Sequence, residues 1–255
     1  MKLRWSLLLP VVLLFLFGAS ANAQNDKHLS KKNALGLKLG YHFYLTNDMM
    51  DYWLMEEEDY NSLAGELTYE FKLSNYVGID FSFCFFETDN DYGNTKRISG
   101  TGYYIDMYPT SNLKVRSFFL SPSIKAYLPL NESVLLYAGV GPDYNYTQAD
   151  FYWRCDVNDG ATTYQLGIRE SDEYHSFGYH GLAGIEYYFY KEPQVHGAYD
   201  APVSLFLEYK YSSLEVKDVD DKVLQNIRTN TGVNVDPHDM NTGGHFVYLG
   251  LRWHF

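Results

Sequence analysis

The final stretch of the chain, from Gly243 to Phe255, constrains the fold more than any other part of the sequence. Every second residue is mostly apolar, and the residues between mix small, aromatic and charged side chains. Because successive side chains of an extended strand point to opposite faces, this alternation predicts a strand with one apolar face. Free chain ends are usually polar and frayed, so a strand that ends on Phe predicts an end that is held in place.

The same period of two recurs along the chain and predicts eight strands. We expect them at residues 34–45, 62–73, 77–85, 113–128, 134–144, 177–189, 203–212 and 244–255. Pro122 interrupts the fourth strand, and because proline has no backbone donor, we expect a bulge there.

The connections between these strands alternate in length. Long loops are expected at 46–61, 87–112, 146–174 and 215–242, whereas 74–75 and 129–132 are short and 191–201 is intermediate. This order puts every long loop at one end of the strands and both chain termini at the other, which is the plan of small outer-membrane barrels. No second domain is expected.

The first residues predict an export signal. Lys2 and Arg4 precede an apolar run from Leu7 to Phe17, and small residues follow at 21–23. We therefore expect a signal peptide at 1–23 and a mature barrel domain at 24–255, beginning near Gln24. No cysteine follows the cleavage site, so no lipid anchor is expected. No later segment has the apolar length of a membrane helix, so a membrane location requires strands.

Charge and cysteine content narrow the function classes. The formal net charge is −12 at pH 7, which argues against nucleic acid as a partner. The two cysteines, Cys84 and Cys155, are too few for a disulfide framework. A single bridge between them and two free thiols both remain open.

The distribution of small residues favours a membrane barrel over a soluble one. The interior of an eight-stranded barrel is only wide enough for side chains to fill. Glycines share the polar face of the strands, at positions 36, 40, 78, 139, 141, 178, 184 and 250. If the bulky apolar face pointed inward instead, it would overfill the interior. Aromatic residues near both strand ends, such as Phe85 and Phe177 at one and Phe71 and Phe189 at the other, are typical of interfacial girdles.

With its closing strand ending in Phe, the predicted barrel resembles the small outer-membrane barrels of the OmpA transmembrane domain, OmpX and OmpW type. The resemblance implies a bacterial outer-membrane location with both termini in the periplasm. It also implies contact with membrane lipid and lipopolysaccharide. Trp253 and Phe255 would act as the assembly signal that the barrel assembly machinery recognises.

The polar face carries charges that would crowd a narrow lumen: Lys38, Glu66, Glu70, Asp80, Lys125, Glu186, Glu208, Lys210 and Arg252. Unpaired buried charges are costly, so pairing is expected. Such a network is either a structural filling or a gate that leaks ions or water.

The sequence predicts neither an enzyme nor a cofactor or metal site. His245 is expected to face lipid without a serine two residues on, and His42, His175 and His180 are expected to lack a serine with an orienting acid. Acidic runs in the first loop (Asp48, Asp51, Glu56 to Asp59) and the fourth (Asp218, Asp220, Asp221) lack the spacing of an EF-hand. They are interpreted as solvated surface, bridged by cations already bound to lipopolysaccharide.

We therefore expect a non-enzymatic barrel with a structural or surface-interaction role. Loop tyrosines (Tyr103, Tyr104, Tyr108, Tyr152, Tyr164) are candidate contacts for an unidentified surface partner. The alternative is an OmpW-like conduit for small hydrophobic molecules or ions. Such a conduit needs an apolar lumen pocket, for which Phe86, Phe119 and Phe206 are the inward candidates.

Overall fold

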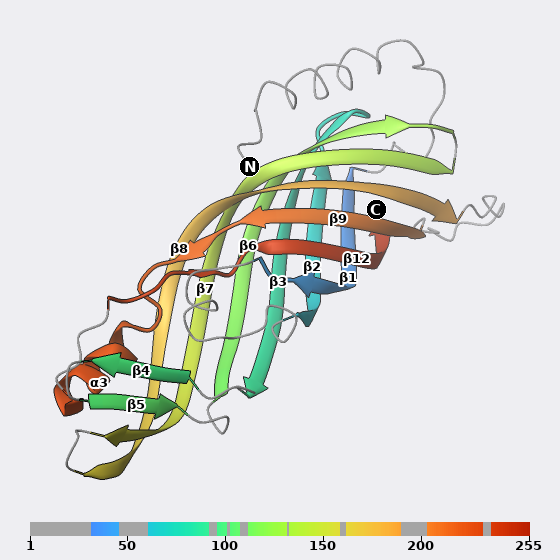
Figure 1. Cartoon of the computed structure of the whole chain (residues 1–255). Coiled ribbons are helices and arrows are strands. Elements are labelled where there is room, and N and C mark those ends of the chain that lie inside the picture. Colours follow the sequence, from blue (N-terminus) through green and yellow to red (C-terminus); the bar gives the residue numbers. More distant parts are fainter. Residues whose placement is uncertain are drawn as a thin grey trace.

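The computed structural model describes residues 32–45, 61–91, 96–100, 103–107, 112–131, 133–158, 162–189, 203–231 and 236–255. Its main feature is a barrel from which one long hairpin extends (Figure 1). The barrel strands are β1 (Asn33–Phe43), β2 (Ser62–Lys72), β3 (Val77–Asp91), β6 (Asn112–Pro129), β7 (Val134–Asn158), β8 (Thr163–Phe189), β9 (Val203–Ser213) and β12 (Gly244–His254). The predicted signal peptide and first loop lie outside the described residues.

The strands form a closed antiparallel barrel. Each barrel strand pairs with its two neighbours, and β1 joins β12 from Ala34 opposite His254 to Phe43 opposite His245. Backbone bonds also run both ways between Asn33 and Phe255, at 2.8 and 3.1 Å, so the last residue is held. The predicted fold class, an eight-stranded antiparallel barrel, is confirmed. Among the described residues, no helix has the length and apolarity to span a membrane.

Two of the predicted long loops are wrong, because β3, β6, β7 and β8 run on into an extension. The hairpin β7–β8 stays paired to Asn158 opposite Thr163, and β4 (Lys96–Gly100) with β5 (Tyr103–Met107) adds to its β7 side. The outward residues of these segments change from apolar to polar while the strand pairing continues. Apolar alternation marks only the part of a strand that faces lipid. The ranges predicted from it are therefore shorter than these four strands in the structure.

The fourth predicted loop also contains regular structure. It forms β10 (Glu215–Val216), helix α3 (Asp221–Thr231) and β11 (Met240–Asn241), with β10 paired to β11. Figure 1 shows α3 at the end of the molecule that holds the extension. This segment contacts the inner side of β8, where the Tyr174 hydroxyl donates to the Val219 carbonyl at 2.7 Å.

The predicted bulge at Pro122 is wrong. The register of β6 with β7 is the same on both sides of the proline, from Leu120 opposite Tyr144 to Ile124 opposite Val140. That register places Pro142 opposite Pro122. Because neither residue has a backbone N–H, the ladder is interrupted here without an inserted residue.

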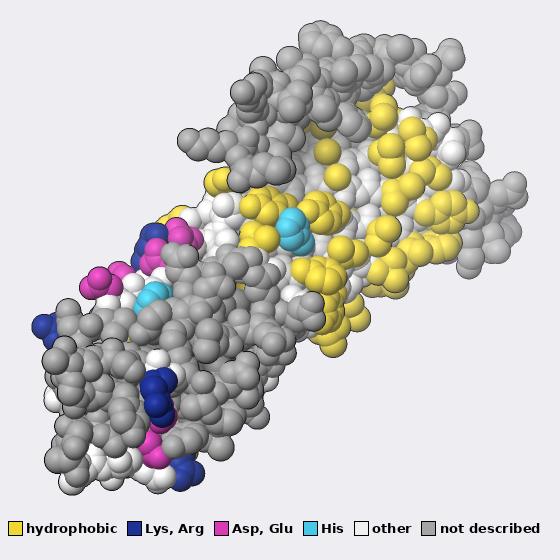
Figure 2. Space-filling view, viewed as in Figure 1, with side chains coloured by type: hydrophobic (Ala, Val, Ile, Leu, Met, Phe, Trp, Pro, Cys, Tyr) yellow, Lys and Arg dark blue, Asp and Glu magenta, His cyan; other side chains and the backbone are white. Residues whose placement is uncertain are grey.

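The outer face of the barrel is apolar and the inner face is polar. Leu39, Leu249, Leu207 and Ile185 form one row across four strands, and Figure 2 shows such side chains gathered on the barrel wall. Exposed apolar side chains over a whole wall are the lipid-facing surface of a transmembrane barrel.

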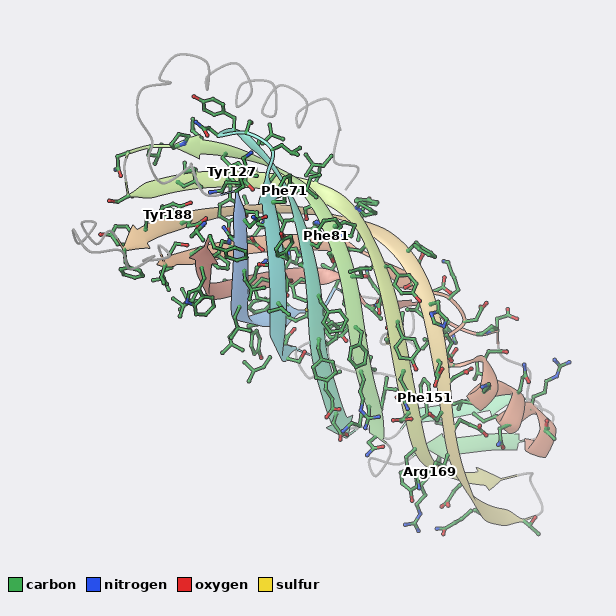
Figure 3. The ribbon with its side chains drawn as sticks, turned by 180° about the vertical axis from the view of Figure 1, so that it is seen from behind. Phe71, Phe81, Tyr127, Phe151, Arg169 and Tyr188 are labelled. Atoms are coloured by element: carbon green, nitrogen blue, oxygen red, sulfur yellow. The ribbon has the colours of Figure 1, made fainter. Side chains whose placement is uncertain are left out.

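A register row marks where this band ends. Phe85, Phe118, Tyr146 and His175 are neighbours on β3, β6, β7 and β8, and the next outward row is Glu87, Arg116, Gln148 and Glu173. Arg116 donates to Glu87 at 2.7 Å, and Lys114 one row on lies 2.8 Å from the same carboxylate. On these four strands the outward side chains thus change from aromatic to charged or amide, which marks where each strand leaves the lipid. Figure 3 shows Arg169 beyond this change, in the extension, and Phe71, Tyr127 and Tyr188 at the opposite end.

Glycines on the inner face make room for large rings. A Cβ on Gly184 would meet the Tyr137 ring, and one on Gly250 would meet the Phe206 ring. The inward glycines thus keep the lumen from being overfilled, as the sequence predicts.

Candidate functional site in the barrel lumen

The lumen is filled by charged side chains that come from strands far apart in sequence. All nine charged residues predicted for it are at most 2% exposed. Lys38, at its centre, donates to Glu66 at 2.5 Å and to Glu208 at 2.6 Å. The second oxygen of Glu208 accepts from the Tyr137 hydroxyl at 2.9 Å. Lys38 therefore ties β1 to β2 and, across the lumen, to β9.

A second group lies toward the chain termini. Arg252 donates to Glu186 at 2.5 Å and lies 3.3 Å from Glu70. Lys125 lies 3.2 Å from Asp80 and 3.8 Å from Glu70 and Glu208. These contacts join all nine residues, with Lys210 at 3.8 Å from Glu66, into one buried network.

Some atoms of this group have no direct hydrogen-bond partner among the described residues: Lys125 Nζ, both carboxylate oxygens of Glu70 and Asp80, and Arg252 Nε and Nη2. Buried polar groups of this kind are usually satisfied by ordered water. The contacts of Lys125 with Asp80 and Glu70 are thus charge attractions at 3.2 and 3.8 Å more than direct hydrogen bonds.

Three members of the network were missed by the sequence prediction: Asp143, His180 and His254. His180 lies 2.8 Å from Asp143 through Nδ1 and 2.7 Å from the Ser123 hydroxyl through Nε2. The expectation that His180 lacks a serine and an acid is therefore wrong. Ser123, Asp143 and His180 lie on β6, β7 and β8, and only the strand register brings them together. His254 Nε2 lies 2.9 Å from Glu186.

The order Ser123, His180, Asp143 matches the hydrogen-bonding pattern of a hydrolase triad. The surroundings of these three residues differ from those of a hydrolase active site. Asp143 also accepts from Ser121 and, at 2.6 Å, from Ser212. Ser123 and His180 are each 2% exposed, so no solvent-open position for a scissile bond lies beside the hydroxyl. We interpret this group as part of the buried polar network.

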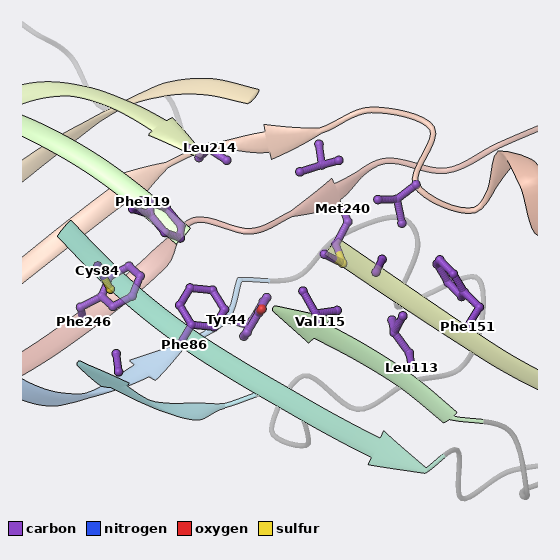
Figure 4. Close-up of a cluster of buried hydrophobic side chains, with 14 of the residues drawn as sticks. Tyr44, Cys84, Phe86, Leu113, Val115, Phe119, Phe151, Leu214, Met240 and Phe246 are labelled. Carbon is purple, nitrogen blue, oxygen red and sulfur yellow. The ribbon is translucent and has the colours of Figure 1, made fainter. Parts of the chain in front are cut away.

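An apolar layer covers the network on the side of the extension. The His42 ring stacks on Phe246 at 4.1 Å between centroids and lies 4.4 Å from Phe86, which in turn lies 5.7 Å from Phe119. Phe86 and Phe119, two candidates for a conduit pocket, are thus packed against neighbouring rings (Figure 4). The third candidate, Phe206, lies beside the ion-paired network, where the Arg252 guanidinium is 4.5 Å from the centre of its ring.

Helix α3 and its flanking residues continue this layer outward. Val219, Val223, Leu224, Ile227 and Met240 are buried in one cluster with inward residues of the extension, including Val115 and Phe151. We refer to residues 214–231 and 236–243 as the cap. Within the cap, the Lys217 amino group lies 2.6 Å from the Asp239 carboxylate and 2.8 Å from that of Glu215. These hydrogen bonds raise the pKa of the amino group.

The acidic residues of the cap differ from the solvated surface that the sequence predicts. Asp220 is buried, and its carboxylate accepts from the His238 backbone N–H at 2.7 Å. Asp221 accepts from Gln225, while Asp218 is exposed. Asp220 has a structural role, because its carboxylate accepts from a backbone N–H that would otherwise lack a hydrogen-bond partner. No group of metal-ligating residues forms within the described ranges. The acidic residues of the first loop lie outside them.

The remaining predicted residues lie apart from the lumen. Trp253 and Phe255 face outward and are 40% and 54% exposed. Cys84 is a buried free thiol 3.3 Å from the Tyr248 hydroxyl, and the side chain of Cys155 lies outside the description. Of the loop tyrosines, Tyr152 is exposed on β7, Tyr103, Tyr104 and Tyr164 are placed by their backbones only, and Tyr108 lies outside the described residues.

The fold agrees with a comparison to known families. The model of the outer membrane protein beta-barrel domain matches residues 10–255. The chain belongs to this family. It is therefore a bacterial outer-membrane barrel, embedded in lipid, as the sequence resemblance implied. Among curated proteins, no match is found.

Solved structures of three outer-membrane proteins are similar in part. Ail of Yersinia pestis, in complex with the heparin analogue sucrose octasulfate, is 15% identical over 88% of this chain and 99% of its own, with a TM-score of 0.42. OprG of Pseudomonas aeruginosa is 11% identical over 88% and 97%, with a TM-score of 0.43. The protease OmpT of Escherichia coli is 13% identical over 89% and 97%, with a TM-score of 0.30. These values assign no activity or ligand to this family member.

Proposed function

We propose that this outer-membrane barrel is a non-conducting, non-enzymatic protein with a structural and surface-interaction role. The observation that carries the proposal is the filling of the lumen. An ion-paired network occupies its membrane part, an apolar ring layer lies above, and the cap packs on the wall beyond. A conduit would need an open path through all three layers. Hydrolysis would need a path for a substrate to the Ser123 hydroxyl.

We further propose an orientation. The start of β1 at Asn33, the C-terminal residue and the short turns after β2 and β6 share one end, which is assigned to the periplasm, and the extension then stands outside the cell. Residues 1–23 are assigned as the signal peptide and 24–255 as the mature domain. The extension presents paired strands to a surface partner. The heparin analogue belongs to Ail, and a net charge of −12 opposes the binding of such a polyanion here.

Planar lipid bilayers test the proposal directly. The mature protein is expected to give no current steps, under conditions in which a general porin does. Ile227→Asp, which places a charge in the buried contact of α3, separates the two barriers. If the variant is silent too, the ion-paired lumen is sufficient to block ions. Steps in the variant alone place the barrier at the cap, and steps in the unaltered protein contradict the proposal.

The end of β12 is proposed to be the signal for the barrel assembly machinery. Phe255 is half exposed, and its side chain packs on no buried cluster, while its backbone bonds to Asn33. Deletion of Phe255 is therefore expected to lower the yield in the outer membrane several-fold and to change the stability of already folded protein little. Phe189→Ala, which removes an equally exposed aromatic at the same end, is the control. Equal yields of the truncated and full-length chains would contradict this role.

A further inference from the structure

A pair of tyrosines encloses a histidine at two separate places on the outer wall. On β7 and β8, the Tyr144 hydroxyl lies 2.7 Å from His175 Nδ1. On β9 and β12, the Tyr209 hydroxyl lies 2.5 Å from His245 Nδ1. Each time, the tyrosine two residues further along, Tyr146 or Tyr211, faces the histidine directly in the register.

The geometry of the two places is nearly the same. The ring centroids of Tyr144 and His175 lie 6.0 Å apart at 20°, and those of Tyr209 and His245 lie 5.9 Å apart at 28°. For the second tyrosine, the values are 5.3 Å and 50° at His175, and 5.2 Å and 46° at His245. Two strand pairs that share no residue have therefore built the same arrangement.

The hydrogen bond fixes what each histidine offers. When the tyrosine hydroxyl donates to Nδ1, the neutral ring carries its proton on Nε2, the atom on the far side of the ring. The side chain then presents an N–H donor, with the ring of the second tyrosine beside the imidazole. Tyrosine alone would complete an aromatic girdle, so the histidine adds a directed donor that a girdle does not require.

Each histidine is the last outward-facing ring of its strand at the edge of the lipid-facing band toward the extension. His175 belongs to the last aromatic row before the charged row of Glu87, Arg116 and Glu173. His245 is the first outward residue of β12, in a row with Phe43 and Tyr211. In the proposed orientation this edge is the outer leaflet, where acyl chains give way to lipid headgroups.

We propose that the two histidines, each with its tyrosine pair, form two binding sites of the same design for the phosphate groups of outer-leaflet lipid. A phosphate group carries negative charge and accepts hydrogen bonds, so it suits the Nε2 N–H donor of each histidine at the end of an apolar wall. The aromatic faces below contact the acyl chains of the same lipid. The inference rests on the proposed contact with lipopolysaccharide and names the groups that would make it.

The two sites differ in one neighbour. The carboxylate of Glu173 interacts with the Tyr146 hydroxyl at the first site. At the second, the neighbours in the same row are Phe43 and Gly181. A carboxylate repels phosphate, so the site at His245 is the tighter one.

Native mass spectrometry of the mature protein with diphosphoryl lipid A tests the proposal. Two lipids are expected per barrel, and His175→Phe and His245→Phe are each expected to reduce the number to one. The double variant is expected to bind at least about tenfold more weakly, since a hydrogen bond to a charged group is lost at each site. Lipid A stripped of its phosphates should not distinguish the variants from the unaltered protein.

Two controls keep the outcome decisive. Tyr187→Phe alters a tyrosine at the opposite edge of the band and should leave lipid binding unchanged. Tyr209→Phe frees Nδ1 and should weaken the His245 site alone, which ¹⁵N spectra of the ring would record as a change of tautomer. Equal retention of diphosphoryl lipid A by the double variant overturns the proposal and leaves an aromatic girdle only. Bilayer conductance does not enter this test, so the two proposals can fail separately.

Discussion

Glu186→Gln is expected to lower the free energy of unfolding by about 3 to 5 kcal/mol, the cost of removing one partner of a buried ion pair. Glu186 accepts from Arg252 at 2.5 Å, from the Ser204 hydroxyl and from His254 at 2.9 Å. Glutamine has the size of glutamate but no charge to balance the Arg252 guanidinium. The other carboxylate near Arg252, Glu70 at 3.3 Å, is shared with Lys125. Urea titration of the refolded barrel in lipid vesicles measures the difference.

Glu173→Gln is the matched control, since Glu173 is an exposed carboxylate beyond the membrane edge. Its cost is expected to stay below about 1 kcal/mol. Joining Glu186→Gln to Arg252→Leu should recover part of the loss, because no charge then remains unbalanced. A loss below about 1 kcal/mol for Glu186→Gln would mean that the network contributes little to the fold.

The barrel strands and their two faces could be predicted because apolar residues recur at every second position along each strand. Leu207, Leu249 and Leu251 alternate with glycines and charges, and a change of one residue in register would exchange the faces. The held end at Phe255 followed from the same pattern. These properties depend on one strand at a time, which is why a single sequence was enough for them.

The extension and the triad-like group could not be predicted, for different reasons. Beyond the membrane edge the outward residues of β7 and β8, such as Gln148 and Glu173, are polar, so the apolar outward face stops while the strand pairing continues. Ser123, His180 and Asp143 are brought together by the register of three strands, which sequence spacing does not contain. Helix α3 did leave a signal, since Val223, Leu224 and Ile227 have helical spacing within a segment interpreted as a loop.

Leu249→Arg is expected to cost about 2 to 4 kcal/mol, the cost of an arginine at the midplane of a membrane barrel. Leu249 is 55% exposed and is the middle outward residue of β12, with Leu39 and Leu207 beside it. His245→Arg, on the same face and strand but at the edge of the band, is expected to cost about 0 to 1 kcal/mol. The two positions differ in depth in the membrane, so equal costs in the same lipid titration would place the bilayer elsewhere on the wall. Gly250→Arg then reports on the inner face, where a side chain must displace the Phe206 ring, and it should be at least as damaging.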